Sequence, residues 1–521
     1  MKYWDWIDLD SGAAPANVQT DVCIVGAGAA GTFLARELAS RGIDSVILEA
    51  GGTTAVSGKL MGFDPIFGRD PYPGSLVGRF FGVGGSTSHW GGALVPHSRH
   101  DLQACDAYKS TWEIIVKRAN GQVRSVLSSL GYERDLDFEE YPRQLHPVAY
   151  AKLAQAGIDV HSNLIMPFRR KNFSRLWGDI SFLQRSKLFL NATAKTWTLT
   201  SGRGGSLLVT GLESISRSGK SINVLAHRYI IAAGAIESAR ILLEIDRASG
   251  KKMFNPKAMP GRFLADHISL PIAEVAREDR DKTRELFGPR FVDGWMRSFR
   301  FLISSPTSGE PRGFCHLIFE QDNPGFKVAK EFVGALQARR LPDLSVVELL
   351  RGANGLSALA YSRLFRSRLH IPNDTPVRLQ LDIEQMPFSG NCMNLSEEID
   401  AYGRPRVKVD WSIGEGDIQS MAAAAKRVLS LWPNHGGDLP RLNPLDVAQG
   451  IIKPYDSYHP VGTCCMGDGD NAVVDFGLKV VNTENLWSVS TGVLPTAGTA
   501  NPTLTMLCLA QELADRFSRR L

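Results

Sequence analysis

The chain has 521 residues, of which 43% are hydrophobic and 22% are charged, the balance of an ordinary folded protein. This length exceeds what one hydrophobic core usually holds, so we expect two domains. The net charge of +5 is small for the length, and no nucleic-acid partner is expected. The N-terminal residues lack the pattern of a secretory signal, and no stretch is long and apolar enough to be a transmembrane segment. We therefore expect a cytoplasmic protein.

The seven cysteines do not indicate a disulfide framework, because their number is odd and they are widely scattered. Zinc and iron-sulfur sites need Cys or His at short repeated spacings, and no such cluster occurs. We expect no metal.

A β-α-β unit is predicted near the N-terminus. Residues 21–25 form a strand of buried type, the turn Gly26-Ala-Gly28-Ala-Ala-Gly31 follows, and helix-forming residues occupy 32–41 before a second strand over 45–49. Gly26 permits a tight turn, Gly28 and Ala29 lie where a backbone approaches a pyrophosphate, and Gly31 permits close packing of helix on strand. Glu49 ends the second strand, where an acid accepts hydrogen bonds from a ribose. This unit predicts a dinucleotide, either NAD or FAD.

A long segment rich in Gly, Pro and Ser runs from 51 to 92, and segments of this kind are usually functional. It ends in Gly84-Gly85-Ser86-Thr87-Ser88-His89-Trp90-Gly91-Gly92. Its glycines let backbone amides come close to a planar cofactor, while the hydroxyls of Ser86 and Thr87 suit phosphate or ring edges.

Further elements are predicted in the second half of the chain. A strand over 228–232 leads into a helix over 233–243, and residues 378–385 and 407–411 alternate like strands. Glu384 and Gln385 end one of them, where they could hydrogen-bond a substrate hydroxyl or only pair with backbone. A last helix is predicted to start at Asn501 as its cap, with Pro502 in the first helical position.

Four segments together resemble the glucose-methanol-choline (GMC) oxidoreductase family, whose members are FAD enzymes that oxidise alcohols. They are the β-α-β unit ending in Leu48-Glu49-Ala50-Gly51-Gly52, Gly84-Gly85-Ser86-Thr87, Ala232-Ala-Gly-Ala-Ile-Glu-Ser-Ala-Arg240, and His459-Pro-Val-Gly-Thr-Cys-Cys-Met-Gly467 continuing to Asn501-Pro-Thr503. The chain departs from the family pattern at Cys465, where an Arg is usual.

The resemblance implies an α/β protein, α+β overall, with a Rossmann-type FAD-binding domain and a discontinuous substrate-binding domain on a mainly antiparallel sheet. The FAD-binding domain would comprise residues 1–115, 186–262 and 451–521, and the substrate-binding domain residues 116–185 and 263–450.

The resemblance also assigns site residues. His459 corresponds to the catalytic histidine and Asn501 to its partner, and an imidazole suits the removal of a hydroxyl proton while hydride leaves the carbon. The positive end of the helix after Asn501 would face the reduced flavin. The cofactor contacts implied are Gly26, Gly28, Ala29, Gly31, Glu49, Gly84, Gly85, Ser86, Thr87, His89, Trp90, Gly91, Ala194, Gly492, Pro502 and Thr503.

The segment Ser88-His89-Trp90 resembles both fungal pyranose oxidases with a covalent histidine-flavin bond and bacterial members that hold FAD noncovalently. We expect noncovalent FAD, with a covalent link to His89 as the alternative. The bacterial pyranose and glycoside oxidase and dehydrogenase branch is the most similar in its motifs, so the expected substrate is a secondary hydroxyl of a sugar or glycoside. The electron acceptor could be oxygen, a quinone or a carrier protein.

Other functional classes remain open on the same sequence. A GMC protein acting on a non-sugar alcohol, a flavin-dependent lyase of the same fold, a flavin monooxygenase and a flavin-binding scaffold would all contain the same glycine turn. The segment 327–370 combines leucines with eight Lys or Arg residues. We expect solvated helix faces there, and a basic amphipathic patch for a membrane or protein partner is the alternative.

Overall fold

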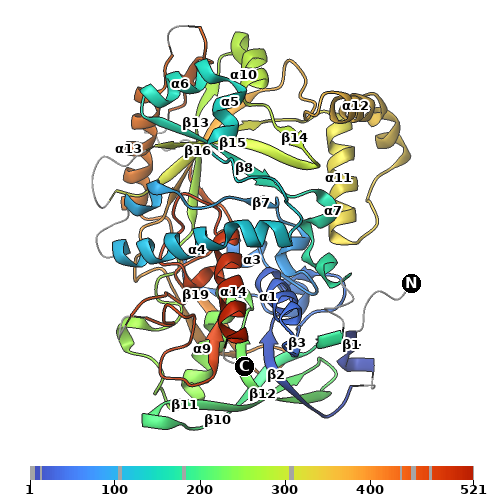
Figure 1. Ribbon diagram of the computed structural model, residues 1–521, viewed down its shortest axis with the longest axis vertical. Helices are drawn as coiled ribbons and strands as arrows, with labels where there is room; N and C mark the ends of the chain where they lie inside the picture. Colours follow the sequence, from blue (N-terminus) through green and yellow to red (C-terminus); the bar gives the residue numbers. More distant parts are fainter. Residues whose placement is uncertain are drawn as a thin grey trace.

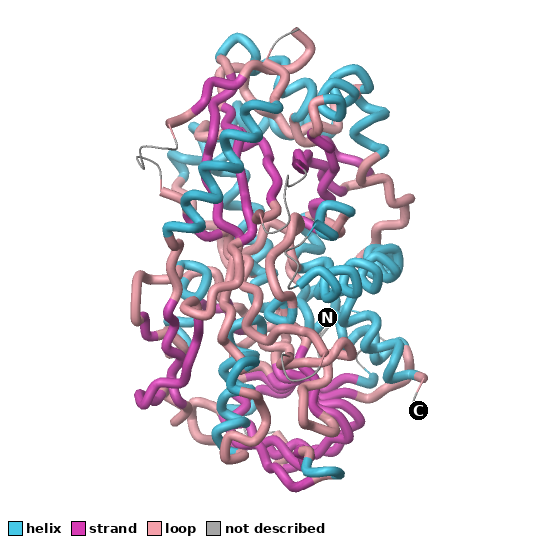
Figure 2. Tube along the Cα trace, turned by 90° about the vertical axis from the view of Figure 1, so that its left-hand side faces the viewer, coloured by secondary structure: helices cyan, strands magenta, loops and turns pink. Residues whose placement is uncertain are grey.

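The computed structural model describes residues 6–11, 14–103, 108–178, 184–303, 310–434, 437–446, 453–468 and 472–519. Two large sheets stand one above the other, with helices between and around them (Figures 1 and 2). The polypeptide passes several times between the two sheets, so each sheet is built from strands that are far apart in the sequence.

The lower sheet has the strand order β1-β9-β3-β2-β12-β11-β10, with β22 paired to β12. Its strands are β1 Trp6–Asp8, β2 Asn17–Val25, β3 Ser45–Leu48, β9 Ser186–Leu190, β10 Thr193–Ser201, β11 Leu207–Ile215, β12 Ser221–Ile231 and β22 Leu486–Ser488. The strands from β1 to β12 and β22 pair in parallel, whereas β10, β11 and β12 pair antiparallel. The central strand β3 is buried along its whole length, which explains its uninterrupted apolar run Val46-Ile-Leu48.

Four longer helices accompany this sheet: α1 Ala29–Ser40, α4 Lys109–Ser129, α9 Gly234–Ala248 and α14 Thr503–Ser518. Helix α14 packs against α1 and α4, so the C-terminal helix lies beside the first helix of the β-α-β unit (Figure 1). Its leucines Leu504, Leu507 and Leu513 are buried, as expected for an apolar face that covers the sheet.

The upper sheet is antiparallel throughout its order β20-β13-β17-β16-β15-β8-β7, with β14 and β21 on its margins. Its strands are β7 Ala93–Leu94, β8 Ile158–Ile165, β13 His267–Val275, β14 Arg290–Val292, β15 Trp295–Ile303, β16 Gly313–Phe319, β17 Val377–Glu384, β20 Leu442–Pro444 and β21 Tyr455–Asp456. Helices α5 Glu140–Leu145, α6 Pro147–Gln155, α10 Arg280–Phe287 and α13 Glu415–Leu431 lie around it (Figure 1).

Shorter elements fill the space between the sheets and at one side. They are β4 Val56–Ser57, β5 Ile66–Phe67, β6 Phe80–Phe81, β18 Cys392–Ile399, β19 Pro405–Asp410, α2 Gly58–Met61, α3 Pro73–Leu76 and α7 Phe168–Lys171. Strands β18, β19 and β5 form a separate small sheet.

A helical hairpin projects beside the upper sheet, formed by α11 Pro324–Ala338 and α12 Val346–Phe365 (Figure 1). Gly325 and Gly355 permit the close crossing, since a Cβ on Gly325 would lie 2.4 Å from the Cα of Gly355. Helix α12 begins with a capping box in which Ser345 and Glu348 satisfy each other's backbone N–H groups. The exposed surface of α12 is mixed: Glu348, Arg351, Asn354 and Ser357 are exposed, and so are large apolar side chains near both ends of the helix. Both expectations for this segment, solvated faces and an amphipathic patch, stay open.

The predicted fold class is confirmed: a Rossmann-type parallel sheet is joined to a mainly antiparallel one. The domain boundaries drawn from the sequence stay a prediction. The prediction of Asn501 as a helix cap is wrong, because α14 begins at Thr503 and Pro502 occupies the cap position. The amide of Asn501 is instead held by other side chains, as described below.

Candidate active site

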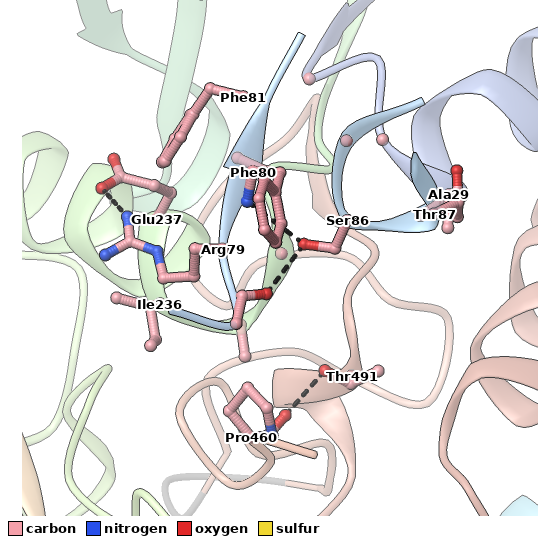
Figure 3. Close-up of a pocket in the computed structure, with 18 of the residues that line it drawn as sticks. Ala29, Arg79, Phe80, Phe81, Ser86, Thr87, Ile236, Glu237, Pro460 and Thr491 are labelled. Carbon is pink, nitrogen blue, oxygen red and sulfur yellow. Dashed lines mark hydrogen bonds and ion pairs between the residues drawn. The ribbon is translucent and has the colours of Figure 1, made fainter. Parts of the chain in front are cut away.

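A pocket of about 620 Å³ connects the glycine turn of the lower sheet with the C-terminal segment beneath the upper sheet. Figure 3 shows part of its wall, with Ala29 on one side and Pro460 and Thr491 on another. The predicted residues that line it are Gly26, Gly28, Ala29, Glu49, Gly85, Ser86, Thr87, His89, Trp90, Gly91, Ala194, His459, Asn501 and Thr503. The structure therefore brings the N-terminal and C-terminal predictions together in one cavity.

The glycine turn is built for close backbone packing. Gly26 has φ +105°, and a Cβ there would lie 2.7 Å from the carbonyl oxygen of Ala232 at the end of the neighbouring strand β12. A Cβ on Gly31 would lie 1.9 Å from the carbonyl oxygen of Gly26, so Gly31 supports the turn and does not line the pocket. Gly28 has no such neighbour within 4 Å and leaves its backbone open to the pocket at the start of α1.

Glu49 lies at the end of β3, as the β-α-β pattern predicts. Its carboxylate accepts hydrogen bonds from the backbone N–H groups of Ala27 at 2.7 Å, Gly51 at 2.9 Å and Gly82 at 2.8 Å. These bonds tie the glycine turn to the loop after β3 and to the loop after β6. Glu49 therefore has a structural role in holding these loops together, and its contact with a ribose stays a prediction.

The loop after β6 presents backbone and rings to the pocket, but its hydroxyls are used within the loop. The Ser86 hydroxyl donates to the carbonyl of Gly78 (3.0 Å), and the Thr87 hydroxyl donates to the carbonyl of Gly84 (2.5 Å). Both hydroxyls thus use their protons to hold this part of the chain, and their contact with a cofactor stays a prediction. Gly84 does not line the pocket. A glycine is needed there because a Cβ would lie 2.2 Å from the amide oxygen of Asn172.

His89 stacks on Phe80 with ring centroids 3.7 Å apart and planes 6° apart. Its Nδ1 lies 2.7 Å from the hydroxyl of Ser88. Burial is the main cause that lowers the pKa of His89, and Arg340 adds to it. A neutral, fixed imidazole thus lines this wall of the pocket.

His459 and Asn501 lie in contact, with the Asn501 Nδ2 3.0 Å from His459 Nε2. Two residues that the sequence did not indicate complete a chain of hydrogen bonds. His267, the first residue of β13, places its Nδ1 3.0 Å from His459 Nδ1, and Arg300 of β15 donates to the Asn501 amide oxygen at 2.7 Å.

The two end groups of this hydrogen-bond chain determine which atom donates and which accepts at each step. The carbonyl of Gly498 can only accept, so His267 donates to it through Nε2 at 2.9 Å and keeps a lone pair on Nδ1. His459 then donates from Nδ1 to His267. At the other end the guanidinium of Arg300 can only donate, so the Asn501 oxygen accepts and its NH₂ group points to His459 Nε2. His459 therefore carries its lone pair on Nε2, at the pocket wall.

The electrostatics keep His459 neutral. Burial, and secondly the neighbouring His267, lower the pKa of His459 to about 3. Burial also lowers the pKa of His267, so neither ring holds a second proton near neutral pH. The pKa of Arg300 is lowered by burial to about 10, which leaves the guanidinium charged.

The backbone at His459 is held by Asp266, which also escaped the sequence analysis. Its carboxyl oxygen Oδ1 accepts from the N–H of His459 at 2.8 Å and of His267 at 2.7 Å, and Oδ2 accepts from the hydroxyl of Tyr72. Burial raises the pKa of Asp266 to about 8. The positioning residues Asp266, His267 and Arg300 gave no pattern in the sequence, because they lie 193, 192 and 201 residues from the residues that they hold.

A second unpredicted feature is an ion pair in the pocket wall. Arg79 and Glu237 lie 2.6 Å apart and both line the pocket (Figure 3). Arg240 and Arg404 lie within 4 Å of Glu237 as well, and these cations lower the pKa of Glu237 to about 2 despite its burial. Glu237 and Arg240 belong to the segment 232–240 that carried the family resemblance, so a signal for them existed.

The predicted substrate residues Glu384 and Gln385 do not line the pocket. Glu384 is buried in a two-pronged ion pair with Arg312, and Gln385 bonds the carbonyl of Ser412 and the carboxylate of Asp417. Both side chains are occupied in the scaffold, so their substrate role is not supported. Gly492 and Pro502 also lie outside the lining, although their neighbours Thr491 and Thr503 belong to it.

Comparison with known proteins agrees with this arrangement at both ends of the chain. The GMC oxidoreductase model matches residues 387–510, which contain His459 and Asn501, and an FAD binding domain model matches residues 19–65, which contain the glycine turn. The C-terminal part of the chain is thus similar to a GMC oxidoreductase domain, and its N-terminal part is similar to an FAD binding domain. The family signature thus falls on the same two segments that meet in the pocket.

Individual relatives are distant. The chain is 24% identical to a 2-methyl-1,2-propanediol dehydrogenase of Mycolicibacterium austroafricanum, over 58% of this chain and 50% of the relative. It is 28% identical to a C-glycoside 3-oxidase of Arthrobacter globiformis, over 23% of each protein. Its match thus spans half or less of the length of these curated relatives. The fold is similar to that of pyridoxine 4-oxidase from Mesorbium loti, with a TM-score of 0.58 and 17% identity over 96% of this chain and 99% of the other.

The pocket suits FAD by its own geometry. The open backbone at Gly28 and the N-terminus of α1 offer N–H groups to a pyrophosphate, and the cavity continues from there past His89 to His459 and Asn501. Gly28, Ala29 and the loop around Trp90 would hold such a cofactor. Within the part of the chain that the structure describes, no helix is long and apolar enough to cross a membrane. In the same part, no group of three or more His, Cys, Asp or Glu side chains could hold a metal ion.

Proposed function

We propose that this protein oxidises an alcohol to a carbonyl compound with FAD as cofactor, His459 as general base and Asn501 as its partner. The observation that carries the proposal is the hydrogen-bond chain of fixed polarity. It leaves one unprotonated nitrogen, His459 Nε2, beside one amide donor, Asn501 Nδ2, at the pocket wall.

This pair fits the two hydrogen-bonding functions of a hydroxyl group. A substrate hydroxyl that enters between them replaces their 3.0 Å hydrogen bond: it donates its proton to His459 Nε2 and accepts a hydrogen bond from Asn501 Nδ2. His459 takes the proton as the carbonyl forms. FAD, when bound, supplies the hydride acceptor for the carbinol carbon. Arg300 and His267 hold the two groups in this orientation without lining the pocket themselves.

For the substrate class we propose a secondary hydroxyl of a sugar or glycoside, supported by the resemblance of residues 88–90 and by the glycoside oxidase among the relatives. A smaller non-sugar alcohol is the second candidate, supported by the diol dehydrogenase, to which the longer match extends. We further propose noncovalent FAD, with His89 as a ring contact, and an acceptor of the oxygen, quinone or carrier-protein class.

The test is an anaerobic panel of monosaccharides, glycosides and small diols added to the purified holoprotein, with flavin absorbance as the signal. Bleaching by a sugar or glycoside, followed by recovery with oxygen or an added quinone, supports the proposal. Bleaching by diols alone would replace the sugar assignment, and product formation without bleaching would indicate a lyase. Trichloroacetic acid precipitation distinguishes the two cofactor states, since noncovalent FAD stays in the supernatant.

The variant His459→Gln tests the base separately from cofactor binding. It should retain FAD but reduce it about 10² to 10⁴ times more slowly, the usual contribution of a general base. Unchanged reduction would refute the role of His459.

A further inference from the structure

The outward face of helix α12 exposes large apolar side chains near both of its ends, with the small or polar residues Ala353, Asn354 and Ser357 between them. Its exposed residues recur at helical spacing, and the fractional exposures reach 72% at Leu350, 74% at Leu364 and 75% at Phe365. Glu348 and Arg351 are exposed near its N-terminal end, and from Ala353 to Phe365 the only charged residue is Arg363, which is directed to the ring of Phe291. We call this surface the α12 face; its large members are Val346, Val347, Leu350, Tyr361, Leu364 and Phe365. Two groups of large exposed apolar side chains on one helix face make this face a candidate interaction site.

Positive charge surrounds the α12 face. Between Lys327 and Arg368 the chain has eight Lys or Arg and three Asp or Glu residues, an excess of five positive charges. Lys327 pairs with Asp322 and Arg368 pairs with Glu285, two carboxylates outside this segment, which leaves three of the five excess charges on the hairpin.

The acidic residues of the hairpin are already engaged. Glu331 pairs with Arg340 at 2.6 Å, and Glu348 accepts from the backbone N–H of Ser345 in the capping box. By contrast, Lys330, Arg351 and Arg366 form no ion pair with the residues that the structure describes. Apolar side chains flanked by cations without an ion pair are complementary to a surface that has an apolar interior and anionic groups at its boundary with water.

From this geometry we propose that the α11–α12 hairpin docks the protein on an anionic lipid bilayer, with the α12 face inserted at the level of the headgroups. An interfacial helix needs no membrane-spanning segment, only an apolar face and basic flanks. Pairing with a second copy through the same face would bring the two sets of cations together, which opposes that occupant.

The hairpin is joined to the active-site pocket. The side-chain amide of Gln337, near the end of α11, donates to the carbonyls of Thr87 and Trp90, both at 3.0 Å. Thr87 and Trp90 line the pocket, so docking at α12 would hold this wall at a fixed distance from the bilayer. The inference itself does not depend on the proposed reaction.

Sedimentation of the holoprotein with vesicles tests the proposal. It should bind vesicles of phosphatidylcholine with phosphatidylglycerol and not vesicles of phosphatidylcholine alone. The double variant Arg351→Glu and Arg366→Glu should lower the partition coefficient at least tenfold, because each basic residue near an anionic surface contributes about fivefold. The double variant Leu350→Glu and Leu364→Glu should also release the protein from the vesicles.

The control is Ile418→Glu on α13, an apolar side chain that is 49% exposed outside the hairpin. It should bind vesicles like the unchanged protein, and all variants should keep the melting temperature, since the substituted side chains are exposed. Absence of binding to anionic vesicles would overturn the proposal, as would equal loss in Ile418→Glu. A dimer in size-exclusion chromatography that only Leu350→Glu with Leu364→Glu dissociates, without vesicle binding, would identify a second copy as the occupant.

Discussion

His267 is expected to control the tautomer of His459 without touching the substrate. In the variant His267→Leu, the Nδ1–H of His459 would lose its buried acceptor. A lost hydrogen bond contributes about 1 kcal/mol, and an unsatisfied buried donor costs about 1–3 kcal/mol. The productive tautomer would therefore be disfavoured by about 1.4–3 kcal/mol, which corresponds to a roughly ten- to hundredfold slower proton transfer.

The variant His267→Asn provides the matched comparison. An Asn oxygen at this position can accept from His459 Nδ1 as the ring nitrogen does, so His267→Asn should remain faster than His267→Leu. Because His267 does not line the pocket, both variants should lower kcat and leave KM nearly unchanged.

The assay is stopped-flow anaerobic flavin reduction across substrate concentrations, with the FAD spectrum and melting temperature as measures of folding. Reduction by His267→Leu at the rate of the unchanged protein would refute the tautomer argument. So would equal rates for the two variants, because only one of them restores the acceptor.

Two further predictions concern the glycine turn and pH. Gly26→Ala should lower FAD content and the melting temperature, because its Cβ would lie 2.7 Å from the carbonyl oxygen of Ala232 at φ +105°. Gly121→Ala within α4, where a Cβ meets nothing within 4 Å, should leave the FAD content unchanged and should not lower the melting temperature, because Ala favours a helix over Gly by about 0.5–1 kcal/mol. Equal losses in the two variants would contradict the reasoning. The pKa of His459 is lowered from 6.5 to about 3, so between these values the unfolded chain binds a proton that the folded chain does not. Its contribution makes folding less stable as pH falls, by up to about 1.4 kcal/mol per pH unit, and urea unfolding of His459→Gln should show a shallower slope between pH 6 and 4.

Local features of this protein could be predicted because they follow from residues close together in the chain. The run Val46-Ile-Leu48, the spacing of Gly26, Gly28 and Gly31 and the acid at Glu49 define a β-α-β unit by backbone requirements alone. The pairing of His459 with Asn501 came from family resemblance, and the structure brings the two into contact.

Tertiary structure decided what surrounds these residues. His267 lies 192 residues from His459, and Arg300 lies 201 residues from Asn501, so no spacing rule connects them. Their strands meet only when the antiparallel sheet forms above the pocket. The sequence places Glu384 at the end of a strand, as it does Glu49. In the structure its carboxylate forms a buried ion pair with Arg312 and does not line the pocket.

The same reason applies to α12. Its leucines predict a helix with an apolar side, but periodicity does not say which side meets a partner. Only the packing against α11 reveals that Leu350, Leu364 and Phe365 face outward. The sequence thus determined the elements and their local chemistry, whereas contacts between distant segments determined which groups act and which surface stays open.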